Sequence, residues 1–174
     1  MDEIIDVLDE FGNITNETIS KDEAHKTGVW HRSVHILIVN KDKTKTLFQK
    51  RCPDKKLYPN MWDISVGGHI MTKEEPITAA LREIKEELGL EYTYSDLKAF
   101  KVFKETLIYD DIYSNEFMYT YLIYDDVDLK DITLQKEEVS DVKWLTKEEM
   151  NKLINNKQVI PHQKAYEILN EILK

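Results

Sequence analysis

Three glutamates, Glu83, Glu86 and Glu87, stand within five consecutive positions of the segment 68–90, which reads GHIMTKEEPITAALREIKEELGL. On a helix, positions i, i+3 and i+4 share one face, so the three carboxylates would lie together. Neighbouring carboxylates repel one another unless a cation neutralises them, and an all-oxygen ligand set suits a hard ion such as Mg²⁺ or Mn²⁺. The spacing therefore predicts a divalent-metal site. A solvated acidic face is the alternative, but Lys85 is the only lysine of this segment after residue 73.

The periodicity of apolar residues in the same segment predicts the helix that would carry the glutamates. A core-facing stripe at positions i, i+4, i+7 and i+11 is formed by Ile77, Leu81, Ile84 and Leu88. At about 100° per residue, the glutamates fall in a separate sector. We expect Ala79 and Ala80 to lie near this acidic sector, where small side chains would leave room for a ligand.

Both ends of this helix are predicted from residue type. Thr72 and Glu75 have the spacing of a capping box, and Pro76 is tolerated in a first helical turn. Gly89 stands where a residue in the left-handed conformation would end the helix. The helix is therefore expected to begin close to Thr72 and to end at Gly89.

The whole segment resembles the Nudix box, whose pattern is Gly, five residues, Glu, seven residues, then Arg-Glu-aliphatic-x-Glu-Glu-x-Gly-aliphatic. Every specified position is filled, by Gly68, Glu74, Arg82, Glu83, Ile84, Glu86, Glu87, Gly89 and Leu90. The resemblance implies an α+β Nudix fold, a mixed β-sheet sandwiched between α-helices. It covers roughly residues 30–150. We expect one Nudix domain over residues 1–174, with 1–29 as an N-terminal extension and 151–174 as a C-terminal helix.

The same resemblance implies a divalent-metal-dependent pyrophosphohydrolase, in which water attacks phosphorus in the diphosphate linkage of a nucleoside diphosphate derivative or a related small molecule. The implied cofactor is Mg²⁺ or Mn²⁺, and the implied metal ligands on the box are Glu83, Glu86, Glu87 and the Gly68 carbonyl. Arg82 is expected to orient a box glutamate, and Glu74 to support the helix or a metal-bound water. One box glutamate could also be the general base.

A second similarity is to the isopentenyl-diphosphate isomerase branch of the same superfamily. The matching segments are HKTGVWHRSVH at 25–35, LFQKR at 47–51, Lys55, Leu57-Tyr58-Pro59, Trp62 and Gly67-Gly68-His69. The isomerases bind a divalent metal through three histidines and two glutamates. The matching positions here are His25, His31, His69 and Glu116, whereas the second glutamate falls on Ser114. The similarity thus implies a possible second metal site, with one carboxylate fewer.

The catalytic cysteine of these isomerases falls on Gly67 in this chain. A glycine cannot move a proton onto or off a carbon skeleton, so the sequence argues against isomerisation. The single cysteine, Cys52, lies in an earlier loop and is not expected to replace it. The complete box favours hydrolysis, and a non-catalytic nucleotide-sensing module remains as a third alternative.

Basic residues near the end of the strand at 46–51 supply a candidate phosphate grip. Arg51 and Lys55 match isomerase positions that bind diphosphate, and Lys21 is a further candidate. Arginine can hold a phosphate through two hydrogen bonds, and lysine acts as a point charge. The alternative is a solvated basic loop.

Carboxylates outside the box offer another candidate base. Glu116 lies on an expected strand, where it is also the candidate metal ligand, and we include it among the catalytic candidates with Glu83, Glu86 and Arg82. Glu137 and Glu138 lie in a loop and are more weakly indicated, because a solvated surface carboxylate is the common case.

The composition agrees with a small metabolic enzyme. A formal charge of −9 over 174 residues disfavours a binder of long nucleic acids, and one cysteine excludes an internal disulfide. The acidic start of the chain lacks the features of a signal peptide, and no apolar run approaches a membrane span. We expect a cytoplasmic protein without membrane contact, which acts on a small diphosphate and is a possible homodimer.

The remaining elements follow from alternation, capping spacing and turn residues. The expected strands are 3–9, 14–19, 31–39, 46–51, 97–108, 113–125 and 139–145. Helices are expected at 20–26, where Ser20 and Glu23 have capping-box spacing, from Thr146, where Glu149 completes the same pattern, and at 162–173. His31 and His35 should share one face of their strand.

Overall fold

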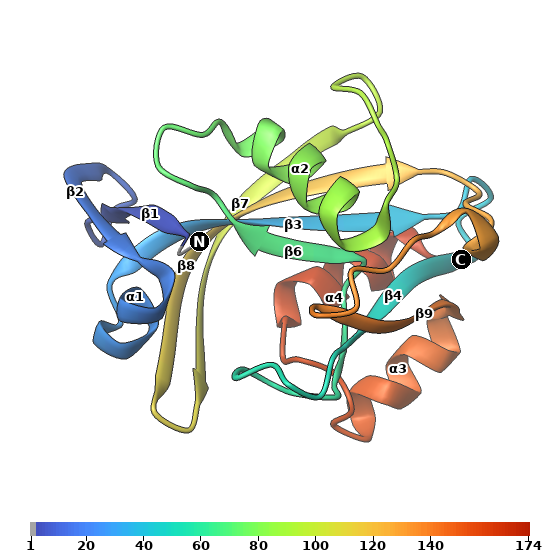
Figure 1. Cartoon of the computed structure of the whole chain (residues 1–174). Helices are drawn as coiled ribbons and strands as arrows, with labels where there is room; N and C mark the ends of the chain where they lie inside the picture. Colours follow the sequence, from blue (N-terminus) through green and yellow to red (C-terminus); the bar gives the residue numbers. More distant parts are fainter. Residues whose placement is uncertain (1–2) are drawn as a thin grey trace.

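The computed structural model describes residues 3–174, which form one mixed sheet with helices on both of its faces (Figure 1). The strands are β1 (Ile4–Leu8), β2 (Ile14–Ser20), β3 (Trp30–Val39), β4 (Lys45–Arg51), β5 (Trp62–Asp63), β6 (Val66–His69), β7 (Lys98–Tyr109), β8 (Ile112–Tyr124) and β9 (Val139–Thr146). The helices are α1 (Lys21–Thr27), α2 (Pro76–Leu88), α3 (Lys147–Asn155) and α4 (Gln163–Ile172), with a short 3₁₀ turn η1 (Leu129–Asp131).

The central strand of the sheet is β3, which pairs along its whole length with β8 in parallel, from Trp30 opposite Asn115 to Val39 opposite Tyr124. On its other edge, residues 33–36 pair with β6 in antiparallel register. A strand that is covered on both faces should be apolar on both, and the HILIV stretch of β3 is buried throughout. The predicted strand at 31–39 is confirmed, and the expected α+β architecture of a mixed sheet between helices is found.

One face of the sheet is covered by α2, which crosses it in Figure 1. Ile84 and Leu88 of the predicted stripe are fully buried, and Ile77 and Leu81 pack against the same core cluster. The prediction for the two alanines is wrong. Ala79 and Ala80 are fully buried in this cluster, because α2 lies close to the sheet and its contact face is wider than the four-residue stripe.

The start of α2 also differs from the prediction. Its N-cap is Glu75, without a side-chain cap, and Pro76 is the first helical residue. Thr72 is not a cap, because its hydroxyl donates to Asp6 of β1 at 2.6 Å. The end is as predicted: Gly89 has φ 68° and closes the helix through its N–H. The other caps expected, from Ser20 on α1 and from Thr146 with Glu149 on α3, are confirmed.

The opposite face of the sheet is covered by the C-terminal helices. Tyr166 and Leu169 of α4 and Met150 of α3 pack with Phe48 of β4 and Leu37 of β3. β3 therefore contributes to two cores, with its even residues from Val34 to Ile38 facing α2 and its odd residues Leu37 and Val39 facing α4. His31, Ser33 and His35 continue this odd face toward the start of the strand.

The N-terminal hairpin is attached to the loop that leads into α2. Ile5 forms a bridge with Met71, and Arg32 donates to Asp6 at 2.8 Å. The predicted hairpin at 3–9 and 14–19 corresponds to β1 and β2. Other predicted strands match within about two residues, whereas β5, β6 and η1 are too short to have been expected as regular elements. Within residues 3–174, no helix is long and apolar enough to cross a membrane.

Candidate active site

A cavity of about 460 Å³ gathers nearly all the functional residues that the sequence predicts. The predicted residues that line it are Lys21, His25, Arg51, Lys55, Gly68, His69, Glu83, Glu86, Glu87, Glu116, Glu137 and Glu138. Arg82 and His31 lie behind this wall and contact residues that line it. Elements far apart in the chain therefore meet at one site, as the resemblance implies.

The three box glutamates project from α2 into this cavity with different exposure. Glu83 and Glu87 are buried, whereas the Glu86 side chain is 48% exposed. Burial raises the pKa of Glu83 to about 7, against the opposing effect of Arg82. Burial also raises the pKa of Glu87, and the neighbouring Glu83 adds to the effect. Burial disfavours the ionised form of Glu83 and of Glu87. A bound cation would stabilise that ionised form, so the pair is suited to a divalent metal.

Gln49 of β4 is a partner of the box that the sequence analysis missed. Its amide donates to Glu87 Oε2 at 2.8 Å, and both side chains are buried. The hydrogen bond fixes one carboxylate oxygen of Glu87 and leaves the other free to bind a ligand. Two signals in the sequence point to it: Gln49 lies in the LFQKR segment that matches the isomerases, and it follows the apolar pair Leu47-Phe48 on the strand.

Arg82 holds the box loop and the helix together. Its Nε and Nη2 donate to the two oxygens of Glu74 at 2.9 and 3.0 Å, in a paired contact that suits the guanidinium fork. Nη1 donates to Glu83 at 2.6 Å and to Glu86 at 3.2 Å. Nη2 also donates to the carbonyl of His69 at 2.9 Å. Arg82 thus hydrogen-bonds to two of the candidate metal ligands, Glu83 and Glu86, and its orienting role stays a prediction.

Gly68 allows Glu83 to pass against the backbone of β6. A Cβ added at Gly68 would lie 2.1 Å from Glu83 Cδ and 2.3 Å from its Oε1, which is impossible for a real side chain. At Gly67 the added Cβ would meet nothing closer than 3.8 Å. Glu83 can therefore hold this position only while residue 68 has no Cβ, whereas Gly67 has room for a side chain.

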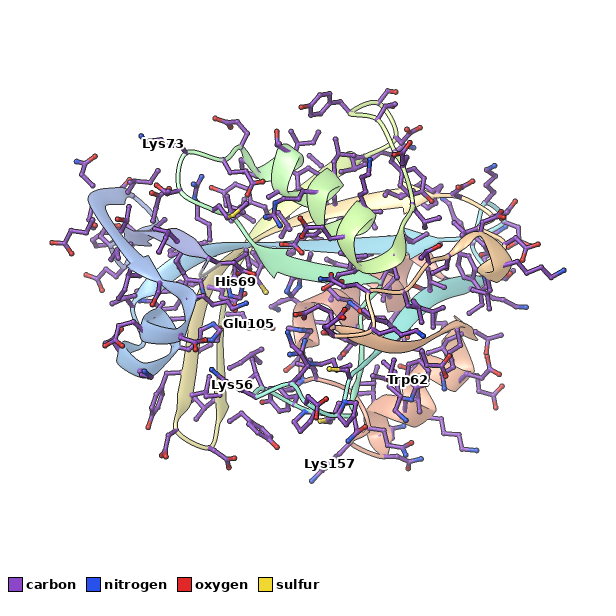
Figure 2. The ribbon with its side chains drawn as sticks, viewed as in Figure 1. Lys56, Trp62, His69, Lys73, Glu105 and Lys157 are labelled. Atoms are coloured by element: carbon purple, nitrogen blue, oxygen red, sulfur yellow. The ribbon has the colours of Figure 1, made fainter. Side chains whose placement is uncertain are left out.

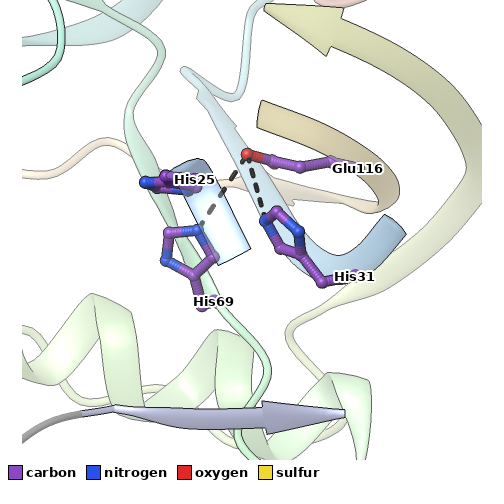
Figure 3. Close-up of side chains that lie close together, drawn as sticks. All are labelled: His25, His31, His69 and Glu116. Carbon is purple, nitrogen blue, oxygen red and sulfur yellow. Dashed lines mark ion pairs between the residues drawn. The ribbon is translucent and has the colours of Figure 1, made fainter. Parts of the chain in front are cut away.

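Three histidines and Glu116 form a second group at the same cavity, which His25, His69 and Glu116 line while His31 lies behind its wall (Figure 3). The ring centroids of His25, His31 and His69 lie 5.2–5.5 Å apart. Glu116 Oε1 lies 3.8 Å from His31 Nε2 and 4.0 Å from His69 Nε2. The parallel register of β3 and β8 places His31 opposite Glu116. The structure thus brings together the four residues that the isomerase similarity indicated.

The hydrogen bonds of this group leave nitrogen lone pairs free. His31 Nδ1 lies 3.0 Å from the Val29 carbonyl, so that nitrogen carries the proton. His69 Nδ1 faces Glu3 at 3.5 Å. His31 Nε2 and His69 Nε2 are both buried without a hydrogen-bond partner among residues 3–174. Orphaned nitrogens beside a carboxylate are the donor set of a transition-metal ion or zinc, so the residues fit the metal that the similarity implies.

Protonation of His25 and His69 is disfavoured. Burial lowers the pKa of His25 to about 4, and the adjacent His69 and His31 act in the same direction. Burial also lowers the pKa of His69. Ser114, at the position of the missing glutamate, donates to Glu116 and lies 3.2 Å from His25 Nε2. The rings of His25 and His69 are therefore neutral, as metal ligands must be.

The candidate phosphate-binding residues line the cavity but already have protein partners. Lys21 lies 3.1 Å from Glu3, and Lys55 forms an ion pair with Glu138. Arg51 donates to the Leu57 carbonyl at 2.9 Å. Lys56 instead pairs with Asp22 at 2.6 Å, and both side chains are exposed. A phosphate would therefore share or replace these carboxylate partners.

A further buried cluster at the cavity was not predicted from the sequence. His162, at the N-cap of α4, has Nδ1 2.6 Å from Glu105 and Nε2 3.3 Å from Asp63. Its ring contacts His35 edge-on, with centroids 4.4 Å apart. Burial alone would lower the pKa of His162, but Asp63 and Glu105 raise it to about 10. Figure 2 shows Glu105 and His69 toward the middle of the molecule, whereas Lys73 and Lys157 extend from its periphery.

The lone cysteine lies behind the cavity wall and contacts a residue that lines it. Cys52 is buried, and its thiol donates to the Glu137 carbonyl at 2.8 Å. It does not line the cavity, unlike Gly67, which occupies the position of the isomerase cysteine. The thiol is therefore not available at the place where isomerase chemistry requires it.

Comparison with known proteins agrees with the site. The family model of the NUDIX domain matches residues 29–165. An uncharacterized Nudix hydrolase of Listeria innocua is 36% identical over 169 residues, covering 97% of this chain and 92% of the relative. The isopentenyl-diphosphate Delta-isomerase 2 of Photorhabdus laumondii is 30% identical over 159 residues, covering 90% of this chain and 84% of the relative.

The fold is likewise shared with solved structures. The crystal structure of DR0079 from Deinococcus radiodurans superposes with a TM-score of 0.75 at 21% identity, covering 99% of this chain and 100% of that chain. Together with the complete box, these matches show that the chain belongs to the Nudix hydrolase family, with isopentenyl-diphosphate isomerases among its relatives.

Proposed function

We propose that the protein is a divalent-metal-dependent pyrophosphohydrolase, which cleaves a diphosphate linkage of a nucleoside diphosphate derivative or related small molecule by water attack on phosphorus. The observation that carries the proposal is the meeting of three box glutamates with basic side chains in one cavity. Anionic ligands for a metal and cationic groups for phosphate oxygens are the two requirements of phosphoryl transfer.

Each group then has a role that follows from its contacts. Glu83, Glu86 and Glu87 would hold Mg²⁺ or Mn²⁺, with the Gly68 carbonyl as a further ligand. Bound divalent ions neutralise phosphate oxygens and lower the pKa of an attacking water. Arg51 lies on the cavity wall, where its guanidinium can bind the diphosphate.

Two more cations and one carboxylate complete the proposed machinery. Lys21 and Lys55 also reach the cavity wall and can bind the diphosphate. Glu86 is the most exposed of the box carboxylates and is our candidate to accept the proton of the attacking water. Glu116 is less suited to that role, because it lies within the histidine group.

The histidine group supports a second metal site made by His25, His31, His69 and Glu116. The unpartnered ring nitrogens of His31 and His69 suit Zn²⁺ or Mn²⁺ better than Mg²⁺. Elemental analysis of the purified protein, with and without His69→Ala, tests this site. One equivalent of metal that disappears in the variant supports the site, and equal metal content in both proteins contradicts it.

The hydrolase proposal is tested with Mg²⁺ and a panel of nucleoside diphosphate derivatives. The wild-type protein should release phosphate or a monophosphate from at least one member, and Glu86→Gln should abolish release. Glu148→Gln, an exposed glutamate of α3 outside the cavity, is the matched control. Tight binding of one compound without turnover would instead indicate a sensor.

Isomerase activity is the remaining alternative, favoured only by the histidine group. It is tested by incubation with isopentenyl diphosphate and detection of dimethylallyl diphosphate. Gly67 offers no side chain for proton transfer, so we expect no conversion. Conversion that survives Cys52→Ser would overturn this expectation.

A further inference from the structure

Glu3, the residue before β1, lines the cavity and has no role in the proposed function. Its Oε1 lies 3.1 Å from Lys21 Nζ, and its Oε2 lies 3.5 Å from His69 Nδ1. Oε2 is buried and has no hydrogen-bond partner among residues 3–174. One carboxylate therefore faces a candidate phosphate-binding lysine with one oxygen and a candidate metal ligand with the other.

Backbone contacts on two sides hold Glu3 at this position. Its carbonyl accepts a hydrogen bond from the Lys21 N–H at 2.9 Å, at the start of α1. The carbonyl of the next residue, Ile4, accepts from the Thr72 N–H at 2.9 Å, in the loop that follows His69. Glu3 is thus fixed between the beginning of α1 and the end of β6, and its side chain has little freedom to leave the histidine group.

Two carboxylates flank the His69 ring and decide which nitrogen carries its proton. Glu3 faces Nδ1 at 3.5 Å, whereas Glu116 Oε1 lies 4.0 Å from Nε2 and already accepts a hydrogen bond from Ser114. The nearer and unengaged acceptor favours the proton on Nδ1. The lone pair is then on Nε2, which is buried without a hydrogen-bond partner among residues 3–174. Nε2 is therefore free to bind a metal beside Glu116.

His31 shows the same arrangement with a different acceptor. Its Nδ1 lies 3.0 Å from the Val29 carbonyl, and its Nε2 lies 3.8 Å from Glu116 Oε1. Histidines that bind metals usually donate their other ring N–H to a carboxylate or a backbone carbonyl, which fixes the ring and its protonated nitrogen. Val29 supplies the carbonyl for His31, and Glu3 supplies the carboxylate for His69. A simple ion pair between Glu3 and Lys21 would not account for the buried oxygen that faces His69.

We propose that Glu3 is a positioning residue for the histidine metal site: its Oε2 accepts a hydrogen bond from His69 Nδ1 and keeps Nε2 directed at Glu116. This inference rests on the proposed function, because the second metal site is part of it. Glu3 belongs to residues 1–29, which the sequence suggested to be an extension of the Nudix core. The N-terminal hairpin thereby contributes to the metal site as well as to the sheet.

The positioning role is tested first in the metal-free protein. Long-range proton–nitrogen NMR spectra of the histidine rings show which nitrogen carries the proton, and His69→Ala identifies the His69 signals. Wild type should have the proton on Nδ1. Glu3→Ala should shift it toward Nε2, because Glu116 is then the nearest carboxylate, whereas Glu3→Gln keeps an acceptor oxygen and should keep Nδ1–H. A proton on Nε2 in wild type, or no shift in Glu3→Ala, would overturn the proposal.

Metal affinity is measured with Co²⁺, whose visible absorption reports histidine ligands. Excess Mg²⁺ is present to fill the box, because Mg²⁺ prefers oxygen ligands. Glu3→Ala should weaken Co²⁺ binding roughly 10- to 100-fold, the usual cost of removing the partner of a metal-binding histidine. Glu3→Gln should lie between wild type and Glu3→Ala. Equal Co²⁺ affinity in wild type and Glu3→Ala would contradict the role of Glu3.

Thr72→Val is the matched control for a structural effect of the hairpin. It removes the 2.6 Å hydrogen bond from the Thr72 hydroxyl to Asp6, and so weakens the attachment of β1 without removing a contact of His69. Co²⁺ affinity should stay within about threefold of wild type, and the His69 proton should stay on Nδ1. A loss of affinity as large as in Glu3→Ala would assign the effect to hairpin attachment and overturn the proposal.

The two measurements separate this role from the proposed metal site. If wild type binds no Co²⁺ through histidine while the His69 proton moves in Glu3→Ala as expected, the metal site fails and the positioning of His69 by Glu3 stands. If wild type binds Co²⁺ and Glu3→Ala changes neither the proton position nor the affinity, the positioning role fails and the metal site stands.

Discussion

Replacing Gly68 with alanine should uncouple the box from its metal without unfolding the protein. The added Cβ would lie 2.1 Å from Glu83 Cδ, 2.3 Å from Oε1 and 2.5 Å from Cγ. Ordinary contact begins at 3.4 Å, so the Glu83 carboxylate must move by about 1.3 Å or more. This movement would break its 2.6 Å hydrogen bond from Arg82 and displace one of the proposed metal ligands.

The size of the effect follows from this displacement. A misplacement of about 1 Å in an active site can cost roughly 100-fold in rate. We therefore expect kcat for Mg²⁺-dependent phosphate release to fall about 100-fold, and Mn²⁺ affinity to weaken roughly 10- to 100-fold. Mn²⁺ binding is measured by electron paramagnetic resonance, so that this part of the prediction does not depend on knowing the substrate.

Gly67→Ala is the matched control, because its Cβ would meet nothing closer than 3.8 Å. It should retain Mn²⁺ affinity within about threefold of wild type and unfold at a similar temperature. Circular dichroism must show that both variants are folded. If folded Gly68→Ala binds Mn²⁺ as tightly as Gly67→Ala does, the argument that Gly68 is required to make room for Glu83 is refuted.

Three other perturbations follow from contacts of buried groups. Gln49→Leu removes the 2.8 Å hydrogen bond to Glu87, and Mn²⁺ affinity should fall roughly 10-fold in the resonance assay; unchanged affinity would contradict a role for Gln49. Lysine in Arg82→Lys cannot reproduce the double contact with Glu74, so the free energy of unfolding in urea should fall by about 1.5–3 kcal/mol. A fall below about 0.5 kcal/mol would contradict a stabilising role for this contact. The pKa of His162 is about 10 when folded and about 6.5 when unfolded, so its stabilising effect is complete below pH 6.5 and lost as pH rises through 10. The stability advantage of wild type over His162→Gln should therefore shrink from pH 6 to pH 10, and an advantage that grows would refute the sign.

Local features made α2 predictable. Its apolar spacing, Pro76 and Gly89 act within a few residues, and the structure agrees with them. The Thr72 prediction failed because the hydroxyl binds Asp6, which lies 66 residues earlier in the chain. A capping pattern records a local preference, and a distant partner can override it.

The site was predictable to the extent that its residues belong to a family pattern. The box and its isomerase-like histidines were named from fixed spacing, and the structure brings them into one cavity. Gln49 and the His162 cluster were not. His162 meets Glu105 and Asp63 across 57 and 99 residues, and no spacing within one element connects them. Such contacts are determined by topology and not by local sequence.

The parallel ladder between β3 and β8 also sets the order in which the chain can fold during synthesis. Every residue of β3 pairs with a partner 85 positions later, so the ladder cannot form until β8 has left the ribosome. At 5–20 residues per second, this delay is roughly 4–17 s. During that time the HILIV stretch has one edge without its native partner, while on the other edge residues 33–36 can pair with β6 and Val39 with β4. The nascent chain therefore carries an aggregation-prone strand edge for seconds before its active site can exist.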